Sequence, residues 1–270
     1  MARRRGRGQR TPAGGKTLVK PAMAVGGFMI EITARPADTM SICFCTLAIH
    51  ASYRERARLL CADLAPAHLV VITDEPADFA DLPVHAIRHE PTGPMAADYL
   101  ERFAATGQGR GAAAYHDKRF AVQAALREFD TAIFLDADSR IRGIPPLVHF
   151  QAGLAVIPVV RHSIAIHLET CGSWRLPAFK DLARELLGDT EALSDANWCH
   201  ETCFAVTKNG SEDRFLWAWG HGAGVMQRQK VFSGEGGVIG LAAAYAGWTV
   251  DFEVLGPLAA LIQHEGGGPK

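Results

Sequence analysis

The stretch Asp130-Thr-Ala-Ile-Phe-Leu-Asp-Ala-Asp-Ser139 decides the fold, because it joins a short apolar strand to two closely spaced acids. The run 131–135 predicts a buried strand that releases Asp136 and Asp138 at its carboxyl end, where open α/β sheets bind ligands. Two hard oxygen ligands at this spacing suit Mg²⁺ or Mn²⁺, ions that bridge to substrate phosphates. The stretch therefore predicts a divalent-metal site for a nucleotide diphosphate. A solvated acidic pair in a turn is the alternative, because Asp is common in turns.

The segments around this stretch alternate between strands and helices. Apolar runs predict strands at 41–49, 68–73, 84–88, 152–160 and 204–207, and helical patterns are found at 53–64, 97–104, 117–129, 177–187, 211–220 and 238–246. The nearly continuous apolar run 68–73 is typical of a strand covered on both faces. Alternation in this order predicts a single α/β domain, with a mostly parallel central sheet flanked by helices and right-handed crossovers.

Length and composition agree with one globular domain. The chain has 270 residues, of which 48% are hydrophobic and 21% charged, enough for a sizeable core. A formal net charge of -1 gives no overall attraction to nucleic acid, so no nucleic-acid partner is expected. No run of about 18 apolar residues is present, which argues against a transmembrane segment. The 6 scattered cysteines indicate reduced thiols rather than a disulfide framework.

The amino-terminal residues differ in composition from the rest. The run Arg3-Arg-Arg-Gly-Arg-Gly-Gln-Arg10 is strongly basic, so 1–38 is interpreted as a disordered basic arm. The arm lacks the apolar core of a secretory signal, and a cytoplasmic protein is expected. A later start codon, at Met23, Met29 or Met40, is an alternative explanation of the arm. The folded domain then spans 39–265, and 266–270 form a flexible tail.

Together these features resemble nucleotide-sugar glycosyltransferases of the GT-A fold. The likeness rests on the early strand 41–49, the basic segment His116-Asp-Lys-Arg-Phe120, the strand-borne Leu135-Asp-Ala-Asp-Ser139, Gly234-Glu-Gly-Gly237 before a helix, and the late His264. It covers roughly 41–265, and the Asp-x-Asp is its most specific motif. The resemblance implies a GT-A-like, Rossmann-like fold. It also implies transfer of a sugar from a nucleotide donor, UDP-linked, to a saccharide or another hydroxyl-bearing acceptor.

The resemblance further implies the metal ligands. Asp136 and Asp138 would hold Mn²⁺ or Mg²⁺ against the donor diphosphate, and the cation would neutralise charge on the departing nucleoside diphosphate. Asp136 and Ala137 are also assigned to donor binding. A late histidine often completes the metal shell in this fold, and His264 is the candidate; an imidazole ligand would favour Mn²⁺. A surface histidine in a glycine-rich tail is the alternative.

Two pairs of residues are assigned to the rest of the donor. Lys118 and Arg119 would bind its phosphates, because cationic side chains match phosphate charge. Adjacent helical residues diverge by about 100°, so only one of the two can face the ligand edge, and Lys118 is preferred. His50 and Asp74, which follow the first two strands, would line the nucleoside pocket. The alternatives are a solvent-facing pair on a helix and ordinary turn residues at strand ends.

The resemblance also implies residues for catalysis and for the acceptor. Glycines on both sides of Glu235 would let the backbone approach a ligand closely. Some retaining members carry a carboxylate at the start of a late helix, so Glu235 is the candidate nucleophile or base and a retaining course is favoured. A helix-start acid stabilised by the macrodipole is the alternative. Trp174 and Trp198 would stack on the acceptor, and His200 and Glu201 would bind its hydroxyl groups; a purely structural role is the alternative for both tryptophans.

Other functions explain parts of the same sequence. A haloacid-dehalogenase-type phosphatase would use Asp136 as its nucleophile, but its Asp-x-Asp strand comes first in the sheet and a further acidic pair follows. A sugar nucleotidyltransferase would need a Gly-rich loop where Leu47-Ala-Ile-His50 stands. A non-catalytic nucleotide- or sugar-binding protein is also open. A zinc site at Cys199, His200 and Cys203 is disfavoured, because adjacent residues rarely ligate one ion and no CxxC partner is visible.

Overall fold

The computed structural model describes residues 40–91, 116–146, 150–159, 161–229, 231 and 234–264. The described residues from Met40 onward belong to one compact unit. The predicted arm 1–38, the helical piece 97–104 and the tail 266–270 lie outside the described residues. The strands are β1 (Ile42–Ala48), β2 (Leu69–Thr73), β3 (His85–Arg88), β4 (Thr131–Leu135), β5 (Ser139–Ile141), β6 (Gly153–Val156), β7 (Cys203–Thr207), β8 (Val250–Asp251) and β9 (Ile262–His264). The helices are α1 (Ala51–Leu64), η1 (Pro76–Phe79), α4 (Lys118–Glu128), α5 (Ile164–Cys171), η2 (Ser173–Arg175), α6 (Leu176–Leu187), α7 (Ala192–Asp195), α8 (Glu212–Arg228), α9 (Glu235–Ala246) and α10 (Gly256–Ala259).

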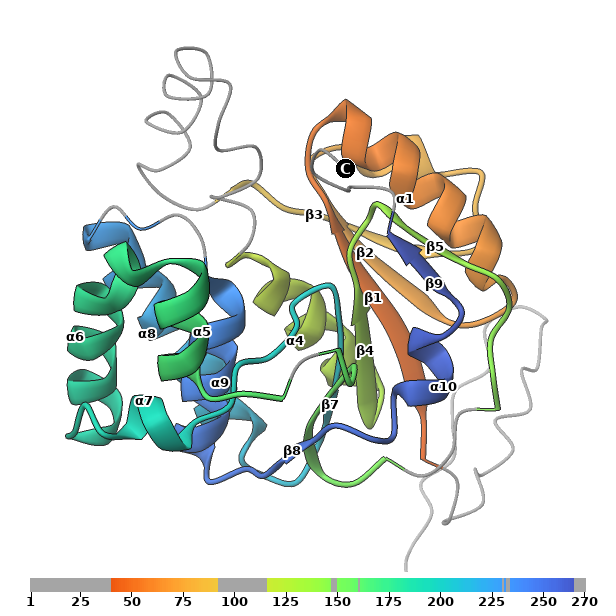
Figure 1. Ribbon diagram of the computed structural model, residues 1–270. Coiled ribbons are helices and arrows are strands. Elements are labelled where there is room, and N and C mark those ends of the chain that lie inside the picture. Colours follow the sequence, from red (N-terminus) through yellow and green to blue (C-terminus); the bar gives the residue numbers. More distant parts are fainter. Residues whose placement is uncertain are drawn as a thin grey trace, which may run out of the picture. The chain divides into compact units, whose positions relative to one another are not determined.

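A seven-stranded sheet forms the centre of this unit, with the strands in the order β3-β2-β1-β4-β7-β6-β8 (Figure 1). β1 pairs in parallel with both β2 and β4, and β2 pairs in parallel with β3. The carboxyl ends of these four strands therefore meet at one edge of the sheet. The predicted α/β class and the mostly parallel sheet flanked by helices are confirmed.

One strand departs from the expected direction. β7 lies between β4 and β6 and is antiparallel to both, whereas the alternation of strands and helices had predicted parallel pairing. All five residues of β7 are buried, as are those of β2 and β4. A continuous apolar run indicates that a strand is covered on both faces, but it carries no information on direction.

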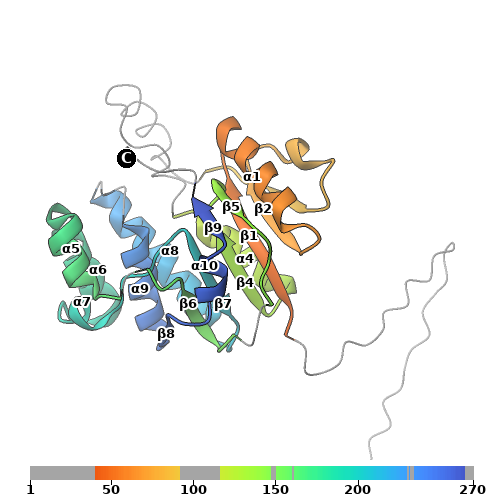
Figure 2. The same cartoon turned by 45° about the vertical axis from the view of Figure 1, so that its right-hand side comes forward.

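Helices cover both faces of the sheet. Successive strand residues point to opposite sides, so each face carries apolar side chains that the helices bury. Cys43 and Cys45 of β1 belong to the core between the sheet and α4, α6, α8 and α9. Phe44 and Ala48 belong to the core on the other face, which α1, η1 and α10 cover. Figures 1 and 2 show α1 on one side of the sheet and the α6–α8–α9 group on the other. No helix among the described residues is both long and apolar enough to cross a membrane.

Several element boundaries differ from the sequence prediction. α8 continues to Arg228 rather than ending near 220, and β6 ends at Val156. Ser211 precedes α8 without capping it by a side-chain bond; its hydroxyl donates to Asn209 instead. α9 begins at Glu235 rather than at the predicted residue 238, so residues 235–237 form the first turn of a helix. The sequence did not predict this turn, because glycine is a poor helix former. In the structure, close packing requires glycine there.

Candidate functional site

The end of β4 presents the two acids of the Asp-x-Asp motif. The backbone N–H of Asp136 donates to the carbonyl of Thr202 at 2.9 Å, which holds the motif against the start of β7. The N–H of Ser139 donates to the carbonyl of Asp136 at 2.9 Å, closing a tight turn. Asp136 and Asp138 therefore stand on one turn at the carboxyl edge of the parallel strands.

His264 reaches this turn through a second, two-stranded sheet. β5 pairs antiparallel with β9, and the pairing sets Ser139 opposite His264. The Nδ1 atom of His264 lies 3.3 Å from Oδ1 of Asp138. One possible ligand atom from each of Asp136, Asp138 and His264 lies within 4.8 Å of the other two. These three residues form a cluster that could hold a metal ion, referred to below as the metal cluster.

The electrostatics of the metal cluster suit a cation. Burial raises the pKa of the Asp138 carboxyl, and the nearby charge of Asp136 raises it further, although His264 and Arg56 lower it. Arg56 of α1 approaches Asp138 only to 3.5 Å and is itself half-exposed. A bound cation would stabilise the ionised form of both acids, because an opposite charge within about 4–6 Å favours the charged form.

Lys118 lies beside the metal cluster at the start of α4. Its side chain is buried, with 4% of the residue exposed. The Nζ atom is 2.7 Å from Oδ1 of Asp136 and 3.3 Å from Oε1 of Glu235, which is also buried. Burial alone would lower the pKa of Lys118, but these two carboxylates outweigh it and raise that pKa above its usual value. The ammonium group therefore links the metal cluster to the start of α9.

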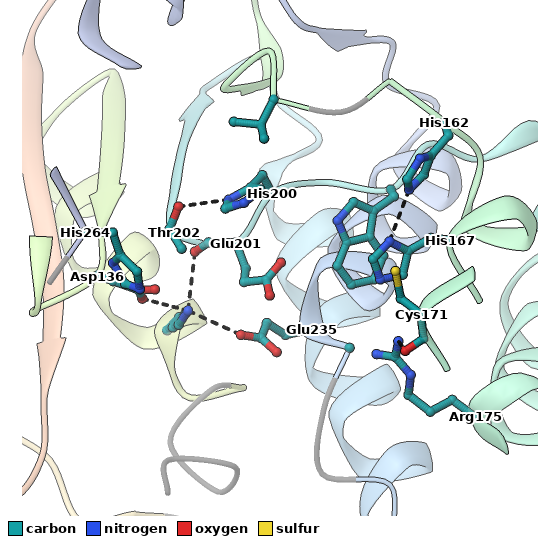
Figure 3. Close-up of a pocket in the computed structure, with 14 residues that line it drawn as sticks. Asp136, His162, His167, Cys171, Arg175, His200, Glu201, Thr202, Glu235 and His264 are labelled. Carbon is teal, nitrogen blue, oxygen red and sulfur yellow. Dashed lines mark hydrogen bonds and ion pairs between the residues drawn. The ribbon is translucent and has the colours of Figure 1, made fainter. Parts of the chain in front are cut away.

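A cavity of about 510 Å³ extends from the metal cluster toward α5 (Figure 3). Figure 3 shows the side chains of Glu201 and Glu235 between Asp136 and His264 on one side and His167 and Arg175 on the other. The described residues that line it are Lys118, Asp136, Val159, His162, His167, Cys171, Arg175, Trp198, His200, Glu201, Thr202, Gly234, Glu235 and His264. Acids, imidazoles and cations thus share one water-accessible space of substrate size.

Two predicted acceptor residues, His200 and Glu201, line the cavity. His200 is half-buried, and its Nδ1 lies 2.8 Å from the hydroxyl of Thr202. Burial raises the pKa of Glu201 to about 8, and repulsion by Glu235 contributes. Glu201 therefore stays largely protonated at neutral pH. Its carboxyl group can both donate and accept a hydrogen bond there.

This pKa predicts a pH-dependent stability that Glu201→Gln should remove. Between about pH 5 and pH 8 the folded protein keeps a proton on Glu201 that the unfolded chain releases, so stability falls as the pH rises through this window. For one proton the slope is at most about 1.4 kcal/mol per pH unit. Urea unfolding of the metal-free protein at several pH values should give a shallower decline for Glu201→Gln. Glu191→Gln, on an exposed position, should keep the wild-type slope; equal slopes for all three proteins would contradict the assignment.

The indole of Trp198 is less open than a sugar-stacking platform would be. It is buried, and the ring of His167 stacks on one face at 3.5 Å between centroids with an interplanar angle of 9°. A Cβ added to Gly236 would lie 2.1 Å from the Cys199 carbonyl and 2.7 Å from the Trp198 ring. The expectation that these glycines admit a ligand is wrong for Gly236, because the close neighbour is the 198–201 segment itself.

The remaining predicted residues do not line the cavity. His50 and Asp74 come together at the ends of β1 and β2, where the N–H of His50 donates to Asp74 at 3.1 Å, but neither is among the described lining residues. Arg119 donates to the carbonyl of His116 at 2.7 Å, so of the cation pair only Lys118 faces the cavity. Trp174 on η2 is 63% exposed and points to solvent. Ala137, which separates the two acids in the sequence, has its side chain buried in the core.

Sequence reasoning missed the far wall of the cavity. His162, His167, Cys171 and Arg175 come from α5, η2 and the segment before them, none of which had been predicted. The only local signal was Ser163, whose hydroxyl accepts from the N–H of Ile166 as an N-cap. This signal could have located the helix, but not its position opposite the metal cluster.

Comparison with known proteins leaves the functional assignment to this geometry. No protein-family model matches the sequence, and no curated protein is similar to it at a significant level.

Proposed function

We propose that the protein is a metal-dependent glycosyltransferase that moves a sugar from a nucleotide-sugar donor, UDP-linked, to a hydroxyl-bearing acceptor. The observation that carries the proposal is the metal cluster, Asp136, Asp138 and His264. Two of its members, Asp136 and His264, line the same cavity as Lys118, Glu201 and Glu235, whereas Asp138 is not among the described lining residues. Two carboxylates and one imidazole are a ligand set that Mn²⁺ accepts well, and they leave coordination positions for phosphate oxygens.

Each group in the cavity has a role in this reaction. A bound Mn²⁺ would supply a Lewis acid that stabilises the departing nucleoside diphosphate. Lys118 adds a second positive charge next to Asp136, where a donor phosphate would arrive. Glu235, whose Oε1 lies 3.3 Å from the Nζ of Lys118, is the carboxylate for the anomeric carbon or the acceptor hydroxyl. Glu201, protonated at neutral pH, can donate a hydrogen bond to a sugar oxygen.

Glu235 also bears on the stereochemical course of the transfer. A retaining transfer needs a group on the face of the sugar opposite the leaving diphosphate, and we assign Glu235 to this role; Figure 3 shows it in the middle of the cavity, between Asp136 and Arg175. A covalent intermediate would form a bond from Glu235 to the anomeric carbon and break the bond to the diphosphate oxygen. Retention of configuration remains our proposal on this basis.

Thermal unfolding with nucleotides tests the proposal. UDP at 100 times its dissociation constant should stabilise the protein by about 2.7 kcal/mol in the presence of Mn²⁺. For a domain of this size that free energy corresponds to a rise of roughly 5–10 °C in Tm. UDP without a divalent ion, and Mn²⁺ without UDP, should give smaller shifts. ADP, GDP and CDP in the same panel identify the base.

The same panel separates the alternatives. Absence of a metal-dependent shift with every nucleoside diphosphate would overturn the proposal. Hydrolysis of p-nitrophenyl phosphate that disappears in Asp136→Asn would favour the phosphatase reading instead. A metal-dependent UDP shift with no release of UDP from any UDP-sugar, with or without acceptors, would favour a non-catalytic binding protein.

A further inference from the structure

Arg175 is a buried cation on the far wall of the cavity. The residue ends η2 and is only 6% exposed. One guanidinium nitrogen, Nη2, donates to the carbonyl of Cys171 at 3.2 Å, and Nε has no hydrogen-bond partner within the part of the chain that the structure describes. Buried donors are nearly always satisfied, and a guanidinium carries five of them. The Nε donor of Arg175 is therefore buried without a hydrogen-bond partner in the described part of the chain.

Two glycines make room for this guanidinium. A Cβ added to Gly172 would lie 2.6 Å from Nε of Arg175, and a Cβ added to Gly234 would lie 2.8 Å from Nη1. The backbone of Gly234 has φ +99, a conformation that other residues rarely adopt. A side chain at either position would displace the guanidinium from its place beside the cavity. The local backbone thus accommodates Arg175 specifically at the cavity wall.

The acids of the cavity do not neutralise Arg175 directly. Glu201 and Glu235 raise its pKa through space, while burial lowers it more, yet no carboxylate in the described part of the chain forms an ion pair with it. Glu235 is paired with Lys118, and Glu201 is largely protonated at neutral pH. The guanidinium remains charged in any case, because arginine does not lose its proton in proteins. A buried charge without a counter-ion favours binding of an anion.

The surroundings of Arg175 offer polar groups that can bind hydroxyl groups. His162 and His167 form a pair at 3.1 Å between Nε2 and Nδ1, and His167 stacks on Trp198. Burial, with repulsion by Arg175 and His162, lowers the pKa of His167 to about 4, so this imidazole is neutral and can bind hydroxyl groups. The far wall therefore combines one cation with two imidazoles and the Trp198 indole.

We propose that the far half of the cavity, formed by Arg175, His162, His167 and Trp198, binds a saccharide that carries a carboxylate or phosphate group, and that Arg175 recognises this anion. These four residues are called the Arg175 subsite. The inference rests on the proposed glycosyltransferase function and narrows its substrate class to acidic or phosphorylated sugars. A planar guanidinium can donate two parallel hydrogen bonds to either anion. The charged group can belong to the donor sugar or to the acceptor, and the test distinguishes the two sources.

The test measures binding by calorimetry to the full-length protein in Mn²⁺. The donor arm compares UDP-glucuronate with UDP-glucose. The acceptor arm compares glucuronate and glucose 6-phosphate with glucose, with UDP present. In the arm that contains the anion, the charged compound should bind about 10- to 100-fold more tightly than its neutral counterpart, as expected for hydrogen bonds to a charged group.

Matched variants assign this preference to Arg175. Arg175→Gln should abolish the preference for the charged compound. Arg175→Lys, which keeps the charge but loses the planar guanidinium, should retain part of this preference. Arg184→Gln, an exposed arginine on the adjacent α6, should leave it unchanged. If Arg175→Gln fails to fold, Arg175→Lys decides the assignment, because a reduced preference with wild-type UDP binding supports the subsite.

The outcomes separate this inference from the function on which it rests. Binding of UDP with Mn²⁺, but equal affinity for charged and neutral partners in both arms, would overturn the Arg175 subsite alone. A preference that survives in Arg175→Gln would do the same. The free saccharides are also titrated without nucleotide. If UDP does not bind at all, a preference for the anionic saccharide that depends on Arg175 would support the subsite while the glycosyltransferase proposal fails.

Discussion

Asp138→Asn should lower the affinity for UDP in Mn²⁺ at least about 100-fold and leave the metal-free protein as stable as the wild type. Asparagine keeps the shape of the side chain but cannot supply the charge of a metal ligand. Asp138 is only 8% exposed, and burial and the charge of Asp136 raise the pKa of its carboxyl group. An acid whose pKa is raised on folding destabilises the folded state when it ionises, so removal of the charge does not weaken the metal-free fold.

Calorimetric titration with UDP in Mn²⁺, alongside thermal unfolding without metal, measures both parts of this prediction. Asp195→Asn serves as the control, because Asp195 is an exposed aspartate at the end of α7. This variant should bind UDP as tightly as the wild type does. Wild-type affinity in Asp138→Asn would mean that the metal cluster does not hold the ion. A large drop in Tm without metal would instead assign a structural role to the Asp138 carboxylate.

The two acids could be predicted from the sequence because their position depends on local structure alone. An apolar strand followed by Asp136 and Asp138 places both carboxylates at the carboxyl edge of the sheet, whatever the rest of the fold. Lys118 could be preferred over Arg119 for a similar reason, since one helix turn decides which of them faces the sheet edge. The cavity lining contains Lys118 and not Arg119.

The rest of the site depends on contacts between distant segments. His264 lies beside Asp138 only because β9 pairs with β5, and three-residue strands carry almost no pattern in the sequence. The position of Arg175 depends on η2, which follows α5 and brings the guanidinium next to Gly234, just before α9. Gly236 shows the limit of a local signal: glycine predicts a close approach, but not whether a ligand or the Cys199 carbonyl is the neighbour.

The ion pairs of Lys118 predict the largest effect on stability. Lys118→Met should lower the free energy of unfolding by about 3–5 kcal/mol without metal, because it leaves the carboxylates of Asp136 and Glu235 without their buried cation. Glu235→Gln removes one of these charges, so the double variant Lys118→Met/Glu235→Gln should be more stable than Lys118→Met alone. Mn²⁺ with UDP should recover part of the loss, since the bound cation takes over the neutralisation of Asp136.

Urea unfolding of the wild type, Lys118→Met, Glu235→Gln and the double variant, with and without Mn²⁺ and UDP, measures these differences in stability. Lys180→Met is the control, because this lysine is exposed on α6 and its loss should change stability by less than about 0.5 kcal/mol. If Lys118→Met costs no more than Lys180→Met, the buried ammonium does not hold the two acids together. If the double variant is no more stable than Lys118→Met, groups other than Lys118 stabilise Glu235. The proposed connection of Glu235 to the metal cluster through Lys118 would then be wrong.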